Sequence, residues 1–212
     1  MKESIVRWTV YFLGLLVMSF GIVLTIKADM GSAPWDVLHI GLYRQLGLTI
    51  GTWSIIVGII VLVASSLLSK QWPQIGAFLN MLLVGLMIDM YMMIPSLQTP
   101  HTFIGKMALL LGGIIITGYG MGLYISAKMG AGPRDSLMLV LMEKTGWRVE
   151  YIRIAMEVFV LLVGWLLGGP VSIGTLVFSV TIGKVIGIAL PQCQQWTVRM
   201  AVAKTGMNGL SR

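Results

Sequence analysis

The chain contains two copies of one eleven-residue segment, separated by 99 positions. Residues 28–38 read ADMGSAPWDVL and residues 127–137 read AKMGAGPRDSL, so Ala, Met, Gly, Pro, Asp and Leu recur in register. After a one-residue slip the agreement continues at an offset of 98, where Ile75-Gly76 matches Ile173-Gly174. A duplication on this scale predicts two structurally related halves.

The composition identifies the broad class of protein. Hydrophobic residues make up 57% of the chain and charged residues only 11%, far from the balance of a soluble domain. Six apolar runs each approach the ~20 residues that a helix needs to cross ~30 Å of hydrocarbon. They are residues 8–26, 52–69, 76–94, 103–126, 151–167 and 173–190. The first run is too long for the apolar part of a cleaved signal peptide.

We therefore predict an all-α polytopic membrane protein, with a single membrane domain over residues 1–212. The first repeat covers about residues 5–95 and the second about residues 103–191. Residues 192–212 are expected to form a basic tail in the cytoplasm.

Two shorter apolar segments, residues 34–46 and 133–145, occupy equivalent places in the two repeats. A helix of this length covers roughly 20 Å, about two thirds of the hydrocarbon core. Each segment begins with Pro and carries Asp two residues later, as is typical of a helix N-terminus. The segment either enters the membrane and returns, or lies flat at the interface with Pro and Asp acting only as caps.

The distribution of basic residues favours six full spans. If the short segments do not cross, 11 of the 15 Lys and Arg residues lie on one side and three on the other, with Lys184 inside a span. The positive-inside rule then puts both termini in the cytoplasm. With eight spans this asymmetry weakens. Three full spans per repeat is an odd number, so we predict two inverted repeats, each with three full transmembrane helices and one short broken or re-entrant helix.

The candidate substrate-binding residues surround the two predicted helix N-termini, because positive helix ends and non-helical backbone often form such sites. They are Gly31, Pro34, Trp35, Asp36, His39, Gly130, Pro133, Arg134 and Asp135. His39 follows Asp36 by three residues, which places both side chains on one helix face. Arg134 replaces Trp35 in the second copy, so the two halves of such a site are chemically unequal.

Charged residues inside spans cost roughly 2.5–3.5 kcal/mol each at a helix centre and normally face a partner or a cavity. Equivalent positions of inverted repeats lie at similar depth, which predicts an intramembrane charge pair between Asp89 and Lys184. This pair either locks the halves together or couples to a substrate or proton. Glu157 lies four residues after Arg153, so we expect a local ion pair, with proton transfer as the alternative. Asn80 is expected to form an interhelical hydrogen bond, with contact to a ligand as the alternative.

The GSAPWDVL and GAGPRDSL segments resemble the YczE/YitT family of bacterial integral membrane proteins. The YczE branch is the closer resemblance, because no soluble C-terminal domain follows the last span. The resemblance implies a small helical protein of the bacterial cytoplasmic membrane, and it implies neither a substrate nor catalytic residues.

The remaining motifs narrow the function. Cys193 is the only cysteine, no nucleotide, metal or nucleophile motif is present, and cytoplasmic loops account for the net charge of +7 without nucleic acid. We expect no enzyme activity, cofactor or metal. The leading hypothesis is a small-solute transporter or permease with its site between the repeats. The alternative is a noncatalytic scaffold or accessory subunit, and contact with lipid is expected in both cases. A homo-oligomer and a separate membrane partner both remain open. A transporter should have a polar pocket at both motifs, whereas a scaffold should be packed shut there.

Overall fold

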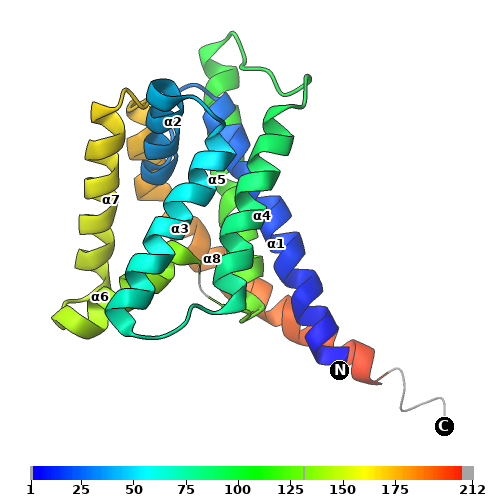
Figure 1. Cartoon of the computed structure of the whole chain (residues 1–212). Helices are drawn as coiled ribbons and strands as arrows, with labels where there is room; N and C mark the ends of the chain where they lie inside the picture. Colours follow the sequence, from blue (N-terminus) through cyan, green and yellow to red (C-terminus); the bar gives the residue numbers. More distant parts are fainter. Residues whose placement is uncertain (1, 131, 207–212) are drawn as a thin grey trace.

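The computed structural model describes residues 2–130 and 132–206, and this part of the chain forms eight helices and no strands. The helices are α1 (Lys2–Lys27), α2 (Pro34–Leu46), α3 (Ile50–Ser69), α4 (Ile75–Met92), α5 (Phe103–Ser126), α6 (Pro133–Thr145), α7 (Val149–Leu166) and α8 (Ile173–Gly206). Long helices run between the upper and lower ends of the molecule, and the two short helices lie at opposite ends, α2 above and α6 below (Figure 1).

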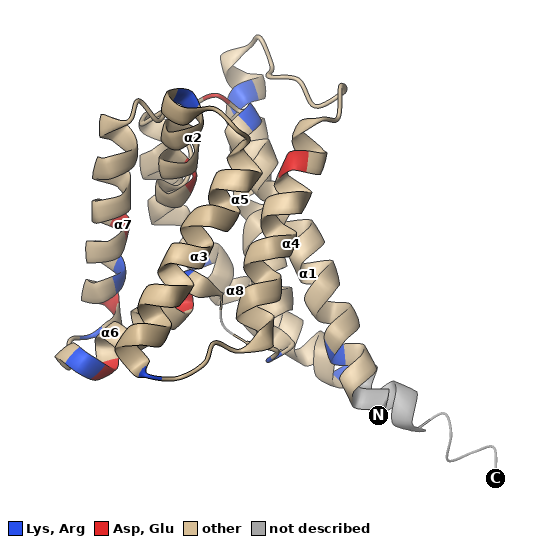
Figure 2. Ribbon diagram, viewed as in Figure 1, with Lys and Arg blue, Asp and Glu red and all other residues tan. Residues whose placement is uncertain are grey.

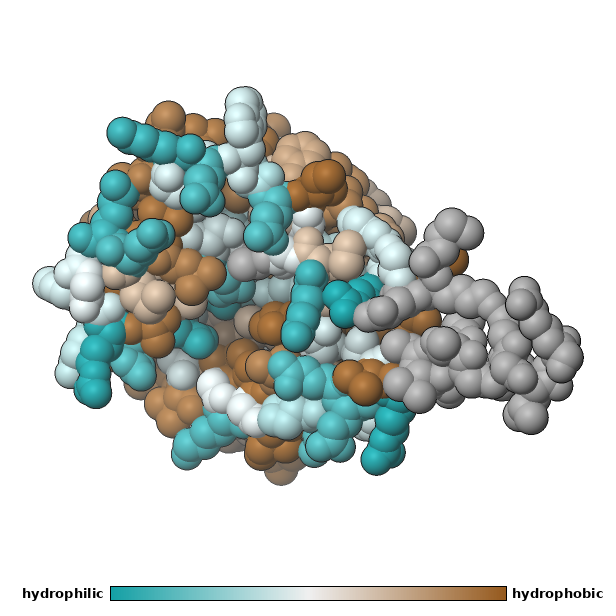
Figure 3. Space-filling model, turned by 90° about the horizontal axis from the view of Figure 1, so that it is seen from below, coloured by the Kyte–Doolittle hydropathy of each residue, from teal (hydrophilic) through white to brown (hydrophobic). Residues whose placement is uncertain are grey.

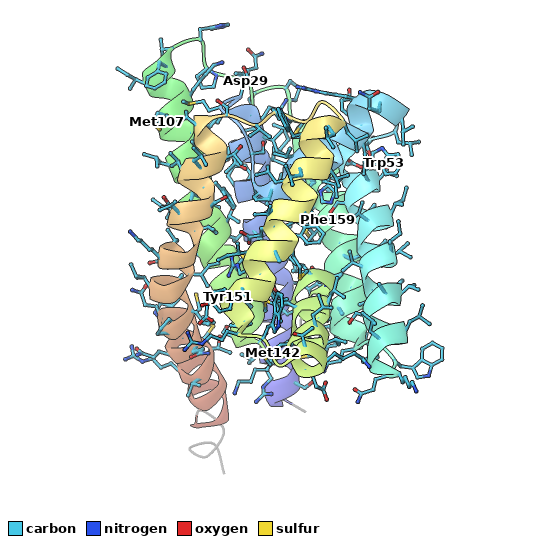
Figure 4. The ribbon with its side chains drawn as sticks, turned by 90° about the vertical axis from the view of Figure 1, so that its left-hand side faces the viewer. Asp29, Trp53, Met107, Met142, Tyr151 and Phe159 are labelled. Atoms are coloured by element: carbon cyan, nitrogen blue, oxygen red, sulfur yellow. The ribbon has the colours of Figure 1, made fainter. Side chains whose placement is uncertain are left out.

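Five helices within the described residues, α1, α3, α4, α5 and α8, are long and apolar enough to cross a membrane. The sixth predicted span corresponds to α7, which has 18 residues but carries Glu150, Arg153 and Glu157. Figure 4 shows Tyr151 near the lower end of this helix and Phe159 further up, so α7 runs between the same two ends. A membrane crossing by α7 stays a prediction.

The two short helices have the bounds that the sequence predicts. Both contain 13 residues, begin with Pro at the first turn and end before a glycine with positive φ, 75° at Gly47 and 68° at Gly146. Proline suits the first turn because its missing N–H would have no intrahelical partner there. Helix α2 is buried from Asp36 to Gly41, which disfavours the alternative that it lies flat on the membrane surface.

The repeat in sequence is also a repeat in backbone conformation. Positive φ angles recur at offsets of 99 and 98 residues. They include non-glycine residues, which rarely adopt this conformation. The equivalent pairs are Asp29 and Lys128, Gly31 and Gly130, Gly47 and Gly146, and Lys70 and Gly168. The turns that lead into and out of each short helix are therefore built in the same way in both halves.

Each half packs its short helix on the other half. Helix α2 contacts α7, and α6 contacts α3. At the end of α2, Arg44 donates to the carbonyl of Gly168 at 2.5 Å and Gln45 to that of Leu167 at 3.1 Å. In the middle of α2, a Cβ atom added to Gly41 would lie 2.7 Å from the Gly164 carbonyl oxygen.

The loops before the short helices also cross between the halves. The Met30 carbonyl accepts a hydrogen bond from Gly174 N at 2.8 Å, at the start of α8. At the equivalent place, the Met129 carbonyl lies so close to Gly76 of α4 that no Cβ atom would fit. The matching Ile-Gly pairs in the sequence therefore mark two equivalent contact points.

Helices α1 and α5 cross with their backbones in contact at four glycines. Gly14 and Gly21 of α1 are equivalent to Gly113 and Gly120 of α5. A Cβ atom added to Gly120 would lie 2.3 Å from Met18 N, and one added to Gly14 would lie 2.4 Å from Tyr124 N. Small residues permit this approach, which is a common mode of helix association in membranes.

Helix α8 is longer than the sequence predicts. The apolar pattern predicts that the last span ends at Leu190, but the helix continues through Pro191 to Gly206, so residues 192–206 of the predicted tail are helical. Residues 207–212 lie outside the described part. Charged residues gather mainly toward the two ends of the bundle (Figure 2), and hydrophilic side chains are prominent on the end that carries both termini (Figure 3).

Candidate functional site

A cavity of about 170 Å³ lies where the N-termini of α2 and α6 approach each other. Residues 33–36 and 132–135 both form part of its wall, and all eight helices contribute side chains. An engineered cavity of about 150 Å³ can hold a benzene molecule, so this space suits a solute of about six non-hydrogen atoms.

Most of the cavity wall consists of repeat-equivalent positions. Of its 27 residues, 22 form eleven pairs related by the 99- or 98-residue offset. The pairs are Met18/Thr117, Ile22/Met121, Ala33/Gly132, Pro34/Pro133, Trp35/Arg134, Asp36/Asp135, Ser54/Arg153, Gly58/Glu157, Asn80/Phe178, Met81/Ser179 and Val84/Ile182. The positions are equivalent but the side chains mostly are not, so a symmetric frame encloses an asymmetric site.

The structure brings together most of the predicted binding residues. The cavity wall contains Pro34, Trp35, Asp36, His39, Pro133, Arg134 and Asp135, together with Asn80 and Glu157. Gly31 and Gly130 are not in the wall. They have φ angles of 94° and 133° and pack against the starts of α8 and α4, so they shape the turns before the short helices.

The second-half carboxylates near the cavity have close partners. Asp135 accepts a hydrogen bond from the Tyr124 hydroxyl at 2.9 Å and lies 3.8 Å from Arg134 Nε. Glu157 lies 3.1 Å from Arg153 Nε, which confirms the predicted local ion pair. These contacts leave the second half with two acids and two bases close together.

Asp36 differs from its equivalent Asp135. Its side chain is buried, with 6% of the residue exposed, and its nearest ionic neighbour is His39 Nδ1 at 3.9 Å, beyond hydrogen-bonding distance. Within the described residues, the Asp36 carboxylate accepts no hydrogen bond. Arg134 is close enough to interact with it electrostatically. A buried carboxylate without a hydrogen-bonded partner is costly to ionise, and Asp36 is the carboxylate of the wall to which no described side chain donates a hydrogen bond.

Four buried polar atoms in the described residues lack a hydrogen-bond partner, and all four belong to residues of the cavity wall. They are Trp35 Nε1, His39 Nδ1, Asn80 Nδ2 and Thr117 Oγ1. The hydrogen bond expected for Asn80 is therefore not made by its amide nitrogen. Native proteins leave few buried polar groups unpaired, and such groups concentrate where a ligand or water completes them.

The backbone at the two helix starts adds further donors. Neither N-cap residue, Ala33 or Gly132, provides a side-chain hydrogen bond to its helix. The first-turn N–H groups of α2 and α6 therefore have no side-chain cap, and each helix directs its positive end toward the cavity region.

The predicted contact between Asp89 and Lys184 is wrong. Asp89 accepts hydrogen bonds from Gly51 N at 2.8 Å and from the Thr49 hydroxyl at 2.5 Å, so it stabilises the N-terminus of α3. Lys184 lies on an exposed face of α8, beside Gly183 and Gly187, which have no neighbouring atoms within 4 Å of an added Cβ. The repeat offset, which predicts a similar depth for the two residues, therefore does not predict their contacts.

The polar wall residues that sequence reasoning missed include Ser54, Ser179, Thr117 and Tyr124, of which the last two are the most informative. Thr117 and Tyr124 lie on α5, seven residues apart, and both are at least 97% buried. Residues with this spacing share a helix face, and two hydroxyl groups on one face of an apolar span are a usable signal. No group of three or more His, Cys, Asp or Glu residues in the described ranges could hold a metal ion.

Together, these features define a helical membrane protein with a polar cavity at the meeting point of two half-length helices. The chain belongs to the family of unknown function DUF6198, whose model matches residues 5–191. It is 42% identical over 205 residues to the uncharacterised membrane protein YczE of Bacillus subtilis strain 168, covering 96% of this chain and 94% of that protein. The membership predicted from the repeated motif is confirmed.

Two further relatives extend the comparison. An uncharacterised Haemophilus influenzae protein is 32% identical over 178 residues, covering 84% of this chain and 80% of its own length. The uncharacterised protein YyaS of Bacillus subtilis is 25% identical over 186 residues, covering 87% and 92%. No solved structure matches the chain.

Proposed function

We propose that this protein is a small-solute transporter or permease of the bacterial cytoplasmic membrane, with its binding site in the cavity between the two repeats. The single observation that carries the proposal is the set of four unpartnered polar atoms in a cavity bounded by both short-helix N-termini. A transport site at the interface of repeats uses this arrangement, because helix ends and polar groups replace the water that a solute loses.

We propose further that the two repeats are inverted relative to each other in the membrane. The support comes from the eleven equivalent pairs in the cavity wall, from the exchanged contacts of α2 and α6, and from their position at opposite ends of the bundle. An inverted pair lets one half open toward one side while the other half closes, which is the basis of alternating access.

The proposed orientation places both termini in the cytoplasm. Helix α6, which carries Lys144 in its last turn, lies at the same end of the bundle as the termini (Figure 1). Helix α2, which carries Arg44 in its last turn, lies at the other end, and Lys27 is the last residue of α1, whose first residues are at the N-terminus. An excess of basic residues in short loops marks the cytoplasmic side. Lipid surrounds the bundle, and no enzyme activity is proposed.

A purely structural scaffold is the less favoured alternative. A scaffold gains nothing from unpaired buried polar groups, since each costs roughly 1–3 kcal/mol. A cavity at the repeated motifs is also the feature by which a transporter differs from a packed scaffold. These two arguments favour transport.

Uptake into vesicles tests the proposal. Purified protein is reconstituted into liposomes and supplied with a mixture of small polar solutes, whose accumulation is measured by mass spectrometry. Wild type should accumulate at least one solute that empty liposomes do not. Equal profiles for wild type and empty liposomes would overturn the transport proposal.

A blocked cavity provides the matched variant. Ser54→Phe adds a six-carbon ring to the wall, and the equivalent position in the second repeat holds the long side chain of Arg153. The ring fills most of a benzene-sized cavity, so uptake should fall about tenfold or more. Ile60→Phe adds the same ring on α3 at a residue that is 62% exposed, and it should retain uptake.

A further inference from the structure

The cavity contains two kinds of unsatisfied group. The first kind consists of hydrogen-bond donors, which are the Trp35 indole N–H and the Asn80 amide, with the Thr117 hydroxyl able to act as a third. The second kind is an acceptor, the buried carboxylate of Asp36, to which no described residue donates a hydrogen bond. A ligand that completes this site must accept several hydrogen bonds and must also supply a positive donor.

The formal charges of the wall also indicate that the ligand carries a positive group. Arg153 pairs with Glu157, and Arg134 lies beside Asp135, so each base of the second half has an acid next to it. Asp36 then remains as the acid without a close partner of its own. With all of these groups ionised, the wall carries one net negative charge, which a bare anion does not neutralise.

The size of the cavity limits the solute that can meet these demands. A space of about 170 Å³ compares with the roughly 150 Å³ that hold benzene, which has six non-hydrogen atoms. Alanine also has six non-hydrogen atoms, and it carries both an ammonium and a carboxylate group.

We infer that the cavity binds a small zwitterion of amino-acid size, with its ammonium group at Asp36 and its carboxylate at the donors of Trp35, Asn80 and Thr117. This inference rests on the proposed transport function and names its substrate class. The uncapped N-termini of α2 and α6 add positive potential for the carboxylate. The ammonium group would give Asp36 the charged hydrogen-bond donor that the described residues do not supply.

Binding measurements with three matched compounds test the inference. The purified protein in detergent is titrated calorimetrically with alanine, with propionate, which lacks the ammonium group, and with ethylamine, which lacks the carboxylate. Glycine and serine serve as further zwitterions. At least one zwitterion should bind about tenfold or more tightly than propionate and ethylamine, because each of these leaves a buried charged or polar group unpaired.

Two substitutions test separately the recognition of the ammonium group and of the carboxylate group of the ligand. Asp36→Asn should abolish the preference for the zwitterion over propionate, because the carboxylate that recognises the ammonium group is gone. Trp35→Phe should weaken the binding of the zwitterion and of propionate to the same extent, because it removes only an N–H donor. The binding of ethylamine, which has no carboxylate, should not change. Asp29→Asn, which changes a loop carboxylate paired with Lys106, is the charge control and should behave as wild type.

The outcomes distinguish this inference from the transport proposal. If propionate binds as tightly as every zwitterion, or if Asp36→Asn leaves the preference intact, the zwitterion assignment is overturned. It is also overturned if no zwitterion binds to folded wild type. Transport itself would still stand if reconstituted vesicles accumulated a solute of another class, and it would fail only if they accumulated none.

Discussion

The contact between α1 and α5 leads to a prediction about two glycines of α5, Gly120 and Gly112. Gly120→Ala adds a Cβ atom 2.3 Å from Met18 N and 2.5 Å from Met18 Cα, whereas Gly112→Ala meets no atom within 4 Å. Backbone atoms cannot rotate away as a side chain can. To restore an ordinary contact distance of 3.4 Å, the two helices must separate by about 1 Å.

The expected changes in the free energy of unfolding have opposite signs for Gly120→Ala and Gly112→Ala. Overpacking by one methyl group costs about 1–3 kcal/mol, and a clash with rigid backbone belongs at the upper end. Alanine regains about 1 kcal/mol over glycine through its helix propensity. We therefore expect Gly120→Ala to lower the free energy of unfolding by about 2 kcal/mol and Gly112→Ala to raise it by up to about 1 kcal/mol.

Unfolding in mixed micelles measures this difference. Each variant is titrated with dodecyl sulfate while tryptophan fluorescence and circular dichroism report the loss of structure. Gly113→Ala, whose nearest backbone contact is the Gly21 carbonyl oxygen at 2.9 Å, should fall between the other two. The reasoning is refuted if Gly120→Ala proves as stable as Gly112→Ala.

Two other features yield measurable consequences. Asp89→Ala removes the carboxylate that caps α3 and should cost about 1–2 kcal/mol in the same assay, whereas Lys184→Met should cost nothing. The double variant should match Asp89→Ala, and a double variant that regains wild-type stability would instead support an ion pair between the two side chains. Single cysteines at Leu46 and Thr145, the equivalent last residues of α2 and α6, should react with a membrane-impermeant maleimide from opposite sides of the membrane. The background for this labelling is Cys193→Ser, and labelling of both cysteines from one side would contradict the inverted arrangement.

The sequence predicts local structure well where the motif itself determines it. Proline at the first turn and glycine after the last turn define both short helices, and the structure has them at residues 34–46 and 133–145 as expected. The repeat offset also identifies the equivalent turns, and the i,i+4 spacing identifies the pair of Arg153 and Glu157. These are contacts over a few residues, for which helix geometry fixes distance and direction together.

The sequence predicts contacts between distant helices less well. The offset relates the chain positions of Asp89 and Lys184, but it does not give the direction in which each side chain points around the bundle. The four-glycine crossing also escapes prediction, because Gly14 and Gly21 are seven residues apart and do not form the familiar four-residue motif. The unpartnered donors of the cavity become visible only when all eight helices are in place.

The placement of α2 on α7 has a consequence for how the chain matures in the membrane. The partners of Arg44 and Gln45 are the carbonyls of Gly168 and Leu167, more than 120 residues later in the chain. When α2 has just been synthesised, the residues that follow α7 and accept these hydrogen bonds have not yet been translated. Helix α2 therefore cannot complete its packing until the second half is synthesised, and a protein truncated before α7 would leave one face of α2 without its partner.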